Sequence, residues 1–419
     1  MTEAKTFKVA LACQGGGTHG AFTWGVLTEI LKAHKSWNLS GGHVFDITAI
    51  SGTSSGALNA LATWYGLADP NRTHGHISPS DRAIERLDCL WETFGATRLT
   101  EMLHNHTAGL LFSLESLGIP LPSINPYALP AKAVLGALES MGAREAYLGF
   151  DALLSEVFPN FDNIDLWTFE ERDPRVLVGA VEVVSGNFEV FDSHKNLEDT
   201  GRRPNGGHYT QRALASWRMR RPLSLNGVAA SGTLPEVLPA RVIPDLGFPT
   251  VDPNKPQRRD DGYYWDGLYS QNPPIREFFD AITPNEKPDE IWVIRINPQE
   301  QNIFKGAITL EEIKDRQNEL VGNMALNQEL DHIMTINEWM SMCHTQLPPP
   351  FDDLKPITVR TIKMKEETAM TLRSSTKFDR NPTHLEKLRD EGIEVASKWL
   401  TEWRKPGTQF ACYPGDARY

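Results

Sequence analysis

The sequence has few cysteines, no internal repeat and no low-complexity tract, and these absences exclude several classes of protein. Its four cysteines are widely scattered along 419 residues. They lack the close pairs of a zinc site and the density of a disulfide scaffold. This usage favours a reducing compartment, and we expect a cytoplasmic protein. The shares of hydrophobic (40%) and charged (23%) residues are those of a soluble globular chain.

Long apolar runs and an excess of positive charge are also missing. No segment approaches the roughly 20 apolar residues that cross a bilayer, and the N-terminal residues show no cationic start followed by a cleavable apolar run. We therefore expect no export, and membrane contact that is at most peripheral. A formal net charge of −12 offers no broad cationic footprint, which argues against a nucleic-acid partner.

Alternating strands and helices are present from the start of the chain. Residues 7–12 and 45–51 have the patterns of buried strands, and each leads through a glycine turn into a helical pattern, at 18–34 and 55–67. Such units build a parallel sheet covered by helices. The later segments predict a hairpin at 175–184 with 188–191 and a further strand at 290–296. They also predict two long amphipathic helices, at 310–343 and 383–404.

Two polar stretches interrupt this pattern, at about residues 196–221 and 244–262. We interpret both as insertions in one domain, because strand-like sequence resumes after each. The sequence therefore predicts an α/β domain over residues 1–300. A mainly helical C-terminal portion, residues 301–419, is expected to pack on the same domain.

A candidate nucleophile lies in Gly52-Thr53-Ser54-Ser55-Gly56, between the second strand and its helix. A sharp strand-to-helix turn pushes its corner residue outward, and glycines two residues to either side let strand and helix approach closely. The helix N-terminus also favours developing negative charge. Ser54 occupies this corner. The alternative is a plain glycine turn in which the serine only caps the helix.

Gly15-Gly16-Gly17 follows the first strand and could supply backbone amides to an oxyanion. The spacing of Gly15, Gly17 and Gly20 also fits a dinucleotide-binding fingerprint. That interpretation requires a second strand that ends in an acidic residue, about 20 positions on, to hold a ribose. Because the second strand leads into Ser54 instead, an oxidoreductase is the weaker hypothesis.

The base that would activate Ser54 is less evident. In the usual α/β-hydrolase order the serine follows several strands and precedes Asp and then His, whereas Ser54 follows only two. Three histidines lie on helical or loop sequence, where packed or solvated side chains are common: His332, His344 and His384. A stronger candidate is Asp266, which ends an aromatic strand-like run and precedes Gly267. An Asp-Gly hairpin turn is the alternative.

Three motifs, in this order and spacing, resemble the patatin-like phospholipase family, and the likeness is closest to its bacterial branch. They are Gln14-Gly15-Gly16-Gly17-Thr18-His19-Gly20, Gly52-Thr53-Ser54-Ser55-Gly56 and Asp266-Gly267-Leu268. The likeness extends over further segments, at 230–235, 265–273, 318–336 and from Ser375 onward. It covers most of the chain except the two insertions.

The resemblance implies a three-layer α/β fold with a mainly parallel sheet and a catalytic dyad, in which Ser54 attacks an acyl carbonyl and Asp266 accepts its proton. It also implies an acyl-enzyme intermediate and no metal or cofactor. The expected oxyanion hole comprises Gly15, Gly16 and Gly17, with the Ser55 amide. Four glycines would support these motifs: Gly20, Gly52, Gly56 and Gly267.

Two residues depart from the family pattern. His19 stands where the family usually has Arg or Lys, so a fixed positive charge beside the oxyanion loop is missing or depends on pH. Leu268 stands where Gly or Ala is usual. Neither change removes a catalytic group, but both could alter substrate choice or rate.

The resemblance favours lipid esters, including phospholipids, as substrates. Apolar residues between 110 and 121 could line an acyl channel or enter a lipid surface, although a core segment explains them equally well. Six arginines could contact anionic head groups or belong to a solvated loop: Arg202, Arg203, Arg212, Arg218, Arg220 and Arg221. A catalytically silent protein that binds lipid or a partner is the other alternative to a hydrolase. The sequence gives no indication of oligomeric state.

Overall fold

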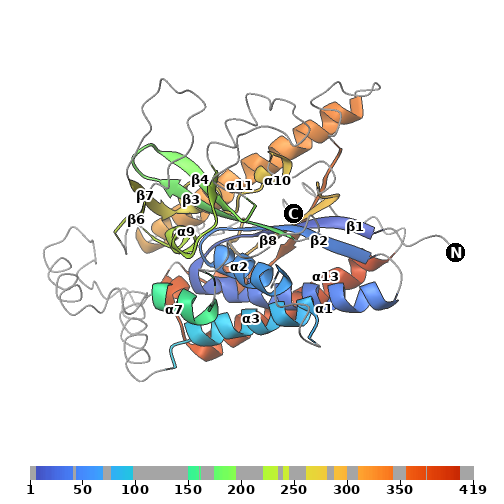
Figure 1. Ribbon diagram of the computed structural model, residues 1–419, viewed down its shortest axis with the longest axis horizontal. Coiled ribbons are helices and arrows are strands. Elements are labelled where there is room, and N and C mark those ends of the chain that lie inside the picture. Colours follow the sequence, from blue (N-terminus) through green and yellow to red (C-terminus); the bar gives the residue numbers. More distant parts are fainter. Residues whose placement is uncertain are drawn as a thin grey trace, which may run out of the picture.

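The computed structural model describes most of the chain and places a nine-stranded sheet between two layers of helices (Figure 1). The described residues are 6–40, 44–68, 77–97, 150–159, 161, 174–194, 220–234, 239–244, 261–280, 287–299, 310–342, 355–373 and 375–405.

The centre of the sheet consists of five parallel strands in the order β3-β2-β1-β8-β9. These strands are β1 (Thr6–Cys13), β2 (Val44–Gly52), β3 (Arg175–Glu182), β8 (Glu290–Arg295) and β9 (Thr358–Lys363). β1 is the middle strand, so the loop that follows it lies at the centre of the sheet edge. The carboxyl ends of neighbouring parallel strands meet there, which is where open α/β sheets bind ligands.

The remaining strands are mixed in direction. β3 forms an antiparallel hairpin with β4 and also pairs with β7, which in turn pairs with β6. β5 pairs with β4 in parallel. Their bounds are β4 (Asn187–Asp192), β5 (Arg220–Pro222), β6 (Arg241–Pro244) and β7 (Asp261–Asp266). The pairing of β7 with β3 carries Asp266 toward the centre of the sheet.

Helices cover both faces of the sheet (Figure 1). On one face lie α1 (Gly20–Ser40), α2 (Ser55–Ala68), α3 (Pro79–Phe94) and α13 (Pro382–Arg404), and on the other lie α10 (Glu277–Asp280) and α11 (Leu310–Met342). Shorter helices are α7 (Phe150–Val157), α9 (Leu225–Ser231) and α12 (Glu366–Thr371), with 3-10 turns η1 (Gly17–His19), η4 (Gly267–Tyr269) and η7 (Ser375–Phe378).

Each face of the sheet has its own apolar core, because successive side chains of a strand point to opposite faces. Val9, Leu11 and Cys13 of β1 belong to the larger core under α1, α2, α3 and α13. Ala10 and Ala12 belong to the smaller core under α10 and α11. The small alanine side chains let α11 lie close to the sheet on that face.

The predicted fold class, a mainly parallel sheet flanked by helices, is confirmed. The strands and helices predicted near the N-terminus, the hairpin and the two long helices are all present, with bounds shifted by a few residues. The sequence analysis missed β9, which adds a strand from the C-terminal portion. Both predicted insertions overlap strands, since β5 includes Arg220 and Arg221 and the ends of β6 and β7 fall within 244–262.

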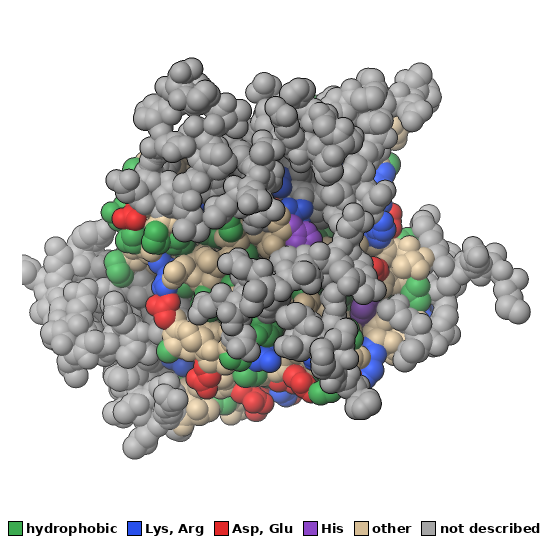
Figure 2. Space-filling model, viewed as in Figure 1, with side chains coloured by type: hydrophobic (Ala, Val, Ile, Leu, Met, Phe, Trp, Pro, Cys, Tyr) green, Lys and Arg blue, Asp and Glu red, His purple; other side chains and the backbone are tan. Residues whose placement is uncertain are grey.

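Two surface properties bear on partners. Over the lower helical layer, acidic, basic and apolar side chains are interspersed and form no patch of one kind (Figure 2). Within the described ranges, no helix combines the length and apolar character needed to cross a bilayer.

Candidate active site

Ser54 occupies a sharp turn between β2 and α2. Its φ of 55° lies in the left-handed region, and among the described residues it is the single non-glycine residue with a positive φ. Such a conformation is unfavourable by roughly 1–3 kcal/mol and persists where the surroundings enforce it. Gly52 and Gly56 allow this turn, because a Cβ on Gly52 would collide with the backbone of Gly56 and one on Gly56 with that of Cys13.

The backbone of the turn is fixed by a neighbouring serine. The amide of Ser54 donates to the Ser231 hydroxyl at 2.9 Å, and that hydroxyl donates to the carbonyl of Gly179 at 2.6 Å. Ser231 ends α9, and Gly179 lies in β3. The Thr53 side chain donates to the carbonyl of Gln271 at 2.6 Å. The serine corner is therefore held by elements that come more than 100 residues later in the chain.

Asp266 ends β7 beside the centre of the sheet and is fully buried. On one side its backbone pairs with Ala180 of β3. On the other side its amide donates a hydrogen bond to the carbonyl of Thr233 at 2.8 Å. Its Oδ1 accepts the amide of Leu268 at 2.8 Å. Its Oδ2 has no hydrogen bond of ordinary length within the described part of the chain.

Burial is the dominant influence on this carboxyl and raises the pKa of Asp266 to about 7. The Leu268 amide, the Ser54 hydroxyl and the charge of Lys377 each act in the opposite direction. Ser54 is thus the neighbouring side chain that interacts with the carboxylate, while Oδ2 has no hydrogen-bond partner among the described residues. Catalytic hydrogen bonds are often long before substrate binds.

The four candidate oxyanion amides differ in their partners. Gly15 is buried and donates to Asn272 Oδ1 at 2.6 Å. The Gly16 amide donates to the Ser55 hydroxyl at 3.2 Å. For the amides of Gly17 and Ser55, no partner occurs within the described ranges. Gly16 and Gly17 are partly exposed, whereas Gly15 is buried.

Polar side chains hold the glycine loop, residues 14–17, in place. Gln14 Oε1 accepts the amides of Ile296 and Asn297, both at 3.0 Å, at the end of β8. Gln14 Nε2 donates to Asn323 Oδ1 of α11 at 2.9 Å. The carbonyl of Gly15 lies 3.4 Å from the amide nitrogens of both Asn297 and Asn272. The loop is therefore anchored to β8, to the segment after β7 and to α11.

His19 follows the glycine loop, is buried and faces η7. Its Nε2 is 2.8 Å from the Thr376 hydroxyl, and the Thr18 hydroxyl donates to the Thr376 carbonyl at 2.7 Å. Burial, with the charges of Lys377 and His384, lowers the pKa of His19 well below its usual value. His19 is therefore neutral at physiological pH and does not carry the positive charge that Arg or Lys would.

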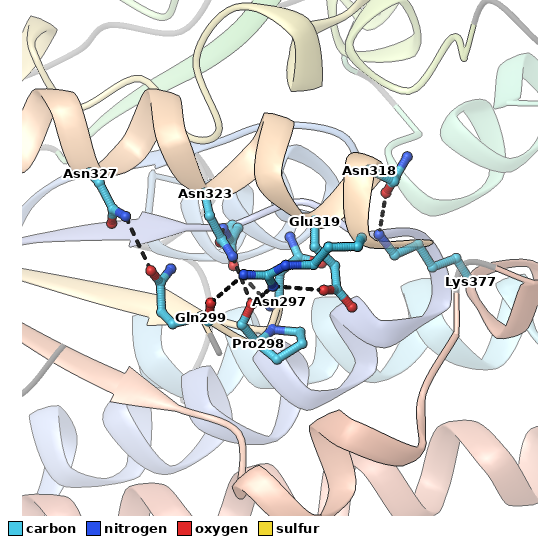
Figure 3. Close-up of polar contacts among 10 residues, drawn as sticks. Asn297, Pro298, Gln299, Asn318, Glu319, Asn323, Asn327 and Lys377 are labelled. Atoms are coloured by element: carbon cyan, nitrogen blue, oxygen red, sulfur yellow. Dashed lines mark hydrogen bonds and ion pairs between the residues drawn. The ribbon is translucent and has the colours of Figure 1, made fainter. Parts of the chain in front are cut away.

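Polar side chains of α11 contact the segment that follows β8 and Lys377 of η7 (Figure 3). Asn323 Nδ2 donates to the carbonyl of Pro298 at 2.9 Å, and Asn318 accepts from Lys377 Nζ at 2.6 Å. Gly322 faces the side chains of Asn272 and Leu268 at close range. Leu268 is buried in this contact, which gives a structural role to one of the two departures from the family pattern.

The structure brings Ser54, Asp266 and the glycine loop together around one site, although they are separated by up to about 250 residues. The sequence analysis did not identify the residues that hold them: Gln14, Ser231, Asn272, Asn297, Asn323, Thr376 and Lys377. Several belong to segments that carried the resemblance, which was the available signal. Their roles depend on contacts that local sequence does not encode.

Other predicted candidates lie elsewhere. The apolar residues between 110 and 121 and four of the six arginines lie outside the described residues. Arg221 forms two hydrogen bonds to Glu189, of 2.7 and 2.9 Å, and Arg220 lies 3.8 Å from Asp192. These two arginines pair with buried carboxylates within the sheet, which corrects their assignment to a solvated loop or a head-group site. Within the described ranges, no group of His, Cys, Asp and Glu has the arrangement of a metal site.

Two solved structures are similar to this chain over most of its length. VipD from Legionella pneumophila aligns at 14% identity and a TM-score of 0.29, covering 94% of this chain and 66% of VipD. Human GIVD cytosolic phospholipase A2 aligns at 12% identity and a TM-score of 0.34, covering 94% of this chain and 62% of that protein. This chain thus spans less than two thirds of the length of each. Comparison with curated protein sequences gives no match.

The family comparison is more specific. The sequence model of the patatin-like phospholipase family matches residues 11–279, which is more than half of the chain. The match begins in β1 and ends in α10, so it includes the glycine loop, the serine turn and the strand that carries Asp266. The chain therefore belongs to the patatin-like phospholipase family.

Proposed function

We propose that the protein is a serine acyl-hydrolase that cleaves carboxylic ester bonds of lipids, with Ser54 as nucleophile and Asp266 as base. The observation that carries this proposal is the pairing of a serine in a left-handed turn with a buried carboxyl whose pKa is about 7. A carboxylate with an ordinary pKa is a weak base at neutral pH, whereas one near 7 accepts a proton more readily.

In the proposed reaction, Ser54 Oγ attacks the acyl carbonyl carbon while its proton passes to Asp266 Oδ2, the carboxylate oxygen without a hydrogen-bond partner in the described part of the chain. The protonated Asp266 then donates to the leaving alcohol, which leaves an acyl group on Ser54. Water attacks this ester in the second step, and Asp266 again accepts the proton. Asp266 returns that proton to Ser54 Oγ as the bond between Ser54 and the acyl carbon breaks, so the fatty acid leaves and both Ser54 and the Asp266 carboxylate are restored.

The developing oxyanion requires donors that are fixed in advance. The amides of Gly17 and Ser55 are the strongest candidates, because neither has a partner in the described part of the chain. The Gly16 amide becomes a third donor if the Ser55 hydroxyl rotates away. Gly15 has a supporting role, since its amide is held by Asn272. This assignment refines the sequence prediction, which included Gly15 among the donors.

The proposed substrates are long-chain lipid esters, including phospholipids, that are presented at a membrane surface to a cytoplasmic enzyme. Family membership supports this substrate class. Vesicles of neutral and anionic phospholipid, compared with soluble esters of the same acyl length, would measure the contribution of the interface. Turnover that increases above the lipid aggregation threshold is expected if membrane contact is peripheral but productive.

The central test is hydrolysis of p-nitrophenyl esters from short to long acyl chains by the intact protein and by Ser54→Ala and Asp266→Asn. Both substitutions should reduce kcat by about a thousandfold or more, because each removes an essential group. A fluorophosphonate should label the intact protein and not Ser54→Ala. Ser341→Ala is the matched control, because Ser341 lies on the exposed face of α11.

Full activity of Ser54→Ala would refute the nucleophile, and full activity of Asp266→Asn would refute the base. Binding of phospholipid vesicles without hydrolysis or Ser54 labelling would instead favour a catalytically silent lipid-binding protein. Binding of a nicotinamide cofactor would favour the oxidoreductase hypothesis.

A further inference from the structure

We propose that Lys377, which lies beyond the family-matched segment, provides the fixed positive charge of the catalytic centre and stabilises the anionic Asp266 and the oxyanion. This inference rests on the proposed function. It assigns Lys377 as a positioning residue that acts through its electric field, and it assigns Asn318 as the residue that holds the Lys377 side chain in place.

The first support is the attachment of η7 to the glycine loop. The Thr376 carbonyl accepts a hydrogen bond from the Thr18 hydroxyl at 2.7 Å, and the Thr376 hydroxyl lies 2.8 Å from His19 Nε2. The neighbouring residue, Lys377, touches the loop itself: a Cβ on Gly17 would collide with the Lys377 carbonyl and lie 2.9 Å from its Cβ. Lys377 is therefore fixed against one of the candidate oxyanion glycines.

The second support is the path of the side chain. From η7, Lys377 extends to α11, where its Nζ donates to Asn318 Oδ1 at 2.6 Å (Figure 3). Both residues are half-buried. A lysine held at both its backbone and its ammonium group loses little additional conformational entropy when substrate binds. Its charge is therefore preorganised, which is what makes electrostatic stabilisation effective.

The third support is the charge balance around the site. The positive charge of Lys377 lowers the pKa of Asp266, and after burial it is the largest influence that lowers the pKa of His19. Two other titratable groups near the loop are less suited to this role: burial lowers the pKa of His384 of α13, and Glu319 of α11 pairs with Arg316 at 3.0 Å. His19 supplies no fixed positive charge to the site, whereas Lys377 does.

The experiment compares the intact protein with Lys377→Met and Lys377→Arg, using a neutral p-nitrophenyl ester so that head-group binding does not contribute. Lys398→Met is the control, since Lys398 is an exposed lysine of α13 and its loss changes the net charge equally. The pH profile of kcat/KM is measured for each variant. The titration of the Asp266 carboxyl is followed separately by 13C NMR, with Asp266→Asn to assign the signal.

Lys377→Met should reduce kcat/KM by about tenfold, because a nearby charge is worth less than a direct oxyanion donor. It should also move the acid limb of the pH profile and the carboxyl titration to higher pH, since Lys377 favours the ionised form. Lys377→Arg should retain both properties, and Lys398→Met should leave them unchanged. Asn318→Leu, which frees the ammonium group, should cause a smaller shift in the same direction.

Unchanged titration and activity in Lys377→Met would overturn the proposal, and so would equal losses in Lys377→Met and Lys377→Arg, which would indicate side-chain shape instead of charge. If the intact protein shows no Ser54-dependent turnover, the proposed function fails. The carboxyl titration still decides whether Lys377 acts on Asp266. If Lys377→Met does not fold, Asn318→Leu gives the decisive titration.

Discussion

At the scale of single residues, the position of Ser54 depends on a hydroxyl group far away in the sequence. Ser231 Oγ accepts a hydrogen bond from the Ser54 amide and donates one to the carbonyl of Gly179, so a donor and an acceptor of the backbone are both satisfied. Loss of this hydroxyl would leave the Ser54 amide without its partner. An unsatisfied buried group destabilises a protein by about 1–3 kcal/mol.

We therefore expect Ser231→Ala to lower kcat by at least about tenfold, because small displacements of a nucleophile reduce rate steeply. KM should change little, since Ser231 is fully buried and its hydroxyl is engaged by the backbone of Ser54 and Gly179. Steady-state kinetics and thermal unfolding would check this. Ser397→Ala serves as the control, because Ser397 is an exposed residue of α13. A KM effect alone would contradict the positioning role.

The pKa of Asp266 predicts the pH dependence of the reaction. The base must be ionised, and a pKa of about 7 means that it is protonated below that value. The rate constant kcat/KM should rise with pH through about 7 and then reach a plateau. The pH profile of the intact protein with a soluble ester measures this limb. An acid limb near pH 4 would show a solvated carboxyl and contradict the structure.

The same group affects stability with a defined sign. The folded pKa lies above the unfolded value of about 3.9, so the folded state binds more protons between these values and its stability decreases as pH rises through that window. Asp266→Asn should therefore raise the melting temperature at about pH 8 and change it little at about pH 4. Equal effects at both pH values would contradict this linkage.

At the scale of an element, α11 has an unusual division of its surface. Asn323 and Glu319 are buried, and Asn323 bonds to Gln14 of the glycine loop, whereas Leu320, Val321 and Met324 of the same turns are exposed. Further along the helix, Leu326 and Leu330 are buried in the ordinary way. The first half of α11 thus contributes polar contacts to the site, and the second half contributes to the apolar core.

Asn323→Leu tests this role, because leucine has a similar size but cannot bond to Gln14 or to the carbonyl of Pro298. We expect a loss of about 1–3 kcal/mol in the free energy of unfolding and a lower kcat through the displaced glycine loop. Gln328→Leu makes the same exchange at an exposed position of the helix and should change neither quantity. Denaturant unfolding and ester hydrolysis provide the two measurements.

At the scale of the whole molecule, a pair of buried carboxyls lies beside the segment that follows Asp266. Glu329 of α11 accepts the side-chain amide of Gln271 at 2.6 Å and the backbone amide of Ile275 at 3.0 Å. Glu277 of α10 is buried nearby. Burial raises the pKa of both groups, and repulsion by Glu329 raises that of Glu277 further.

Because both pKa values are raised above those of the unfolded chain, the folded protein should lose stability as pH rises above about 4.3 and through the folded pKa values. We expect the melting temperature to fall from mildly acidic to mildly alkaline pH. Glu277→Gln should reduce this slope, since the neutral amide has no charge to desolvate. Calorimetry across the range checks the slope, and an identical slope in the variant would contradict the prediction.

How much of this molecule could be predicted from its sequence depends on the range of the interactions involved. The alternation of β1, α1, β2 and α2 was predictable, because side-chain periodicity is encoded within about 20 consecutive residues. The short strand β5 was not, since three residues carry no periodic signal and its formation depends on pairing with β4. β9 was missed although it completes the parallel sheet.

The candidate reactive groups could be identified from the sequence, because the glycine run, the glycine-flanked serine and the Asp-Gly pair are specific in combination, although each has other structural uses alone. The supporting residues could not. Gly15 meets Asn272 across 257 residues of sequence, and His19 meets Thr376 across 357. Polar side chains such as these have no pattern of their own, and they acquire partners only when the chain has folded.

The sequence by itself determined the alternation of the first strands and helices, the candidate serine and carboxylate, and the missing charge at position 19. The tertiary structure decided which groups surround them. Burial against β3 raised the pKa of Asp266, and the packing of η7 on the glycine loop brought Lys377 to the site. Desolvation and charge proximity depend on distances in space, which local sequence does not specify.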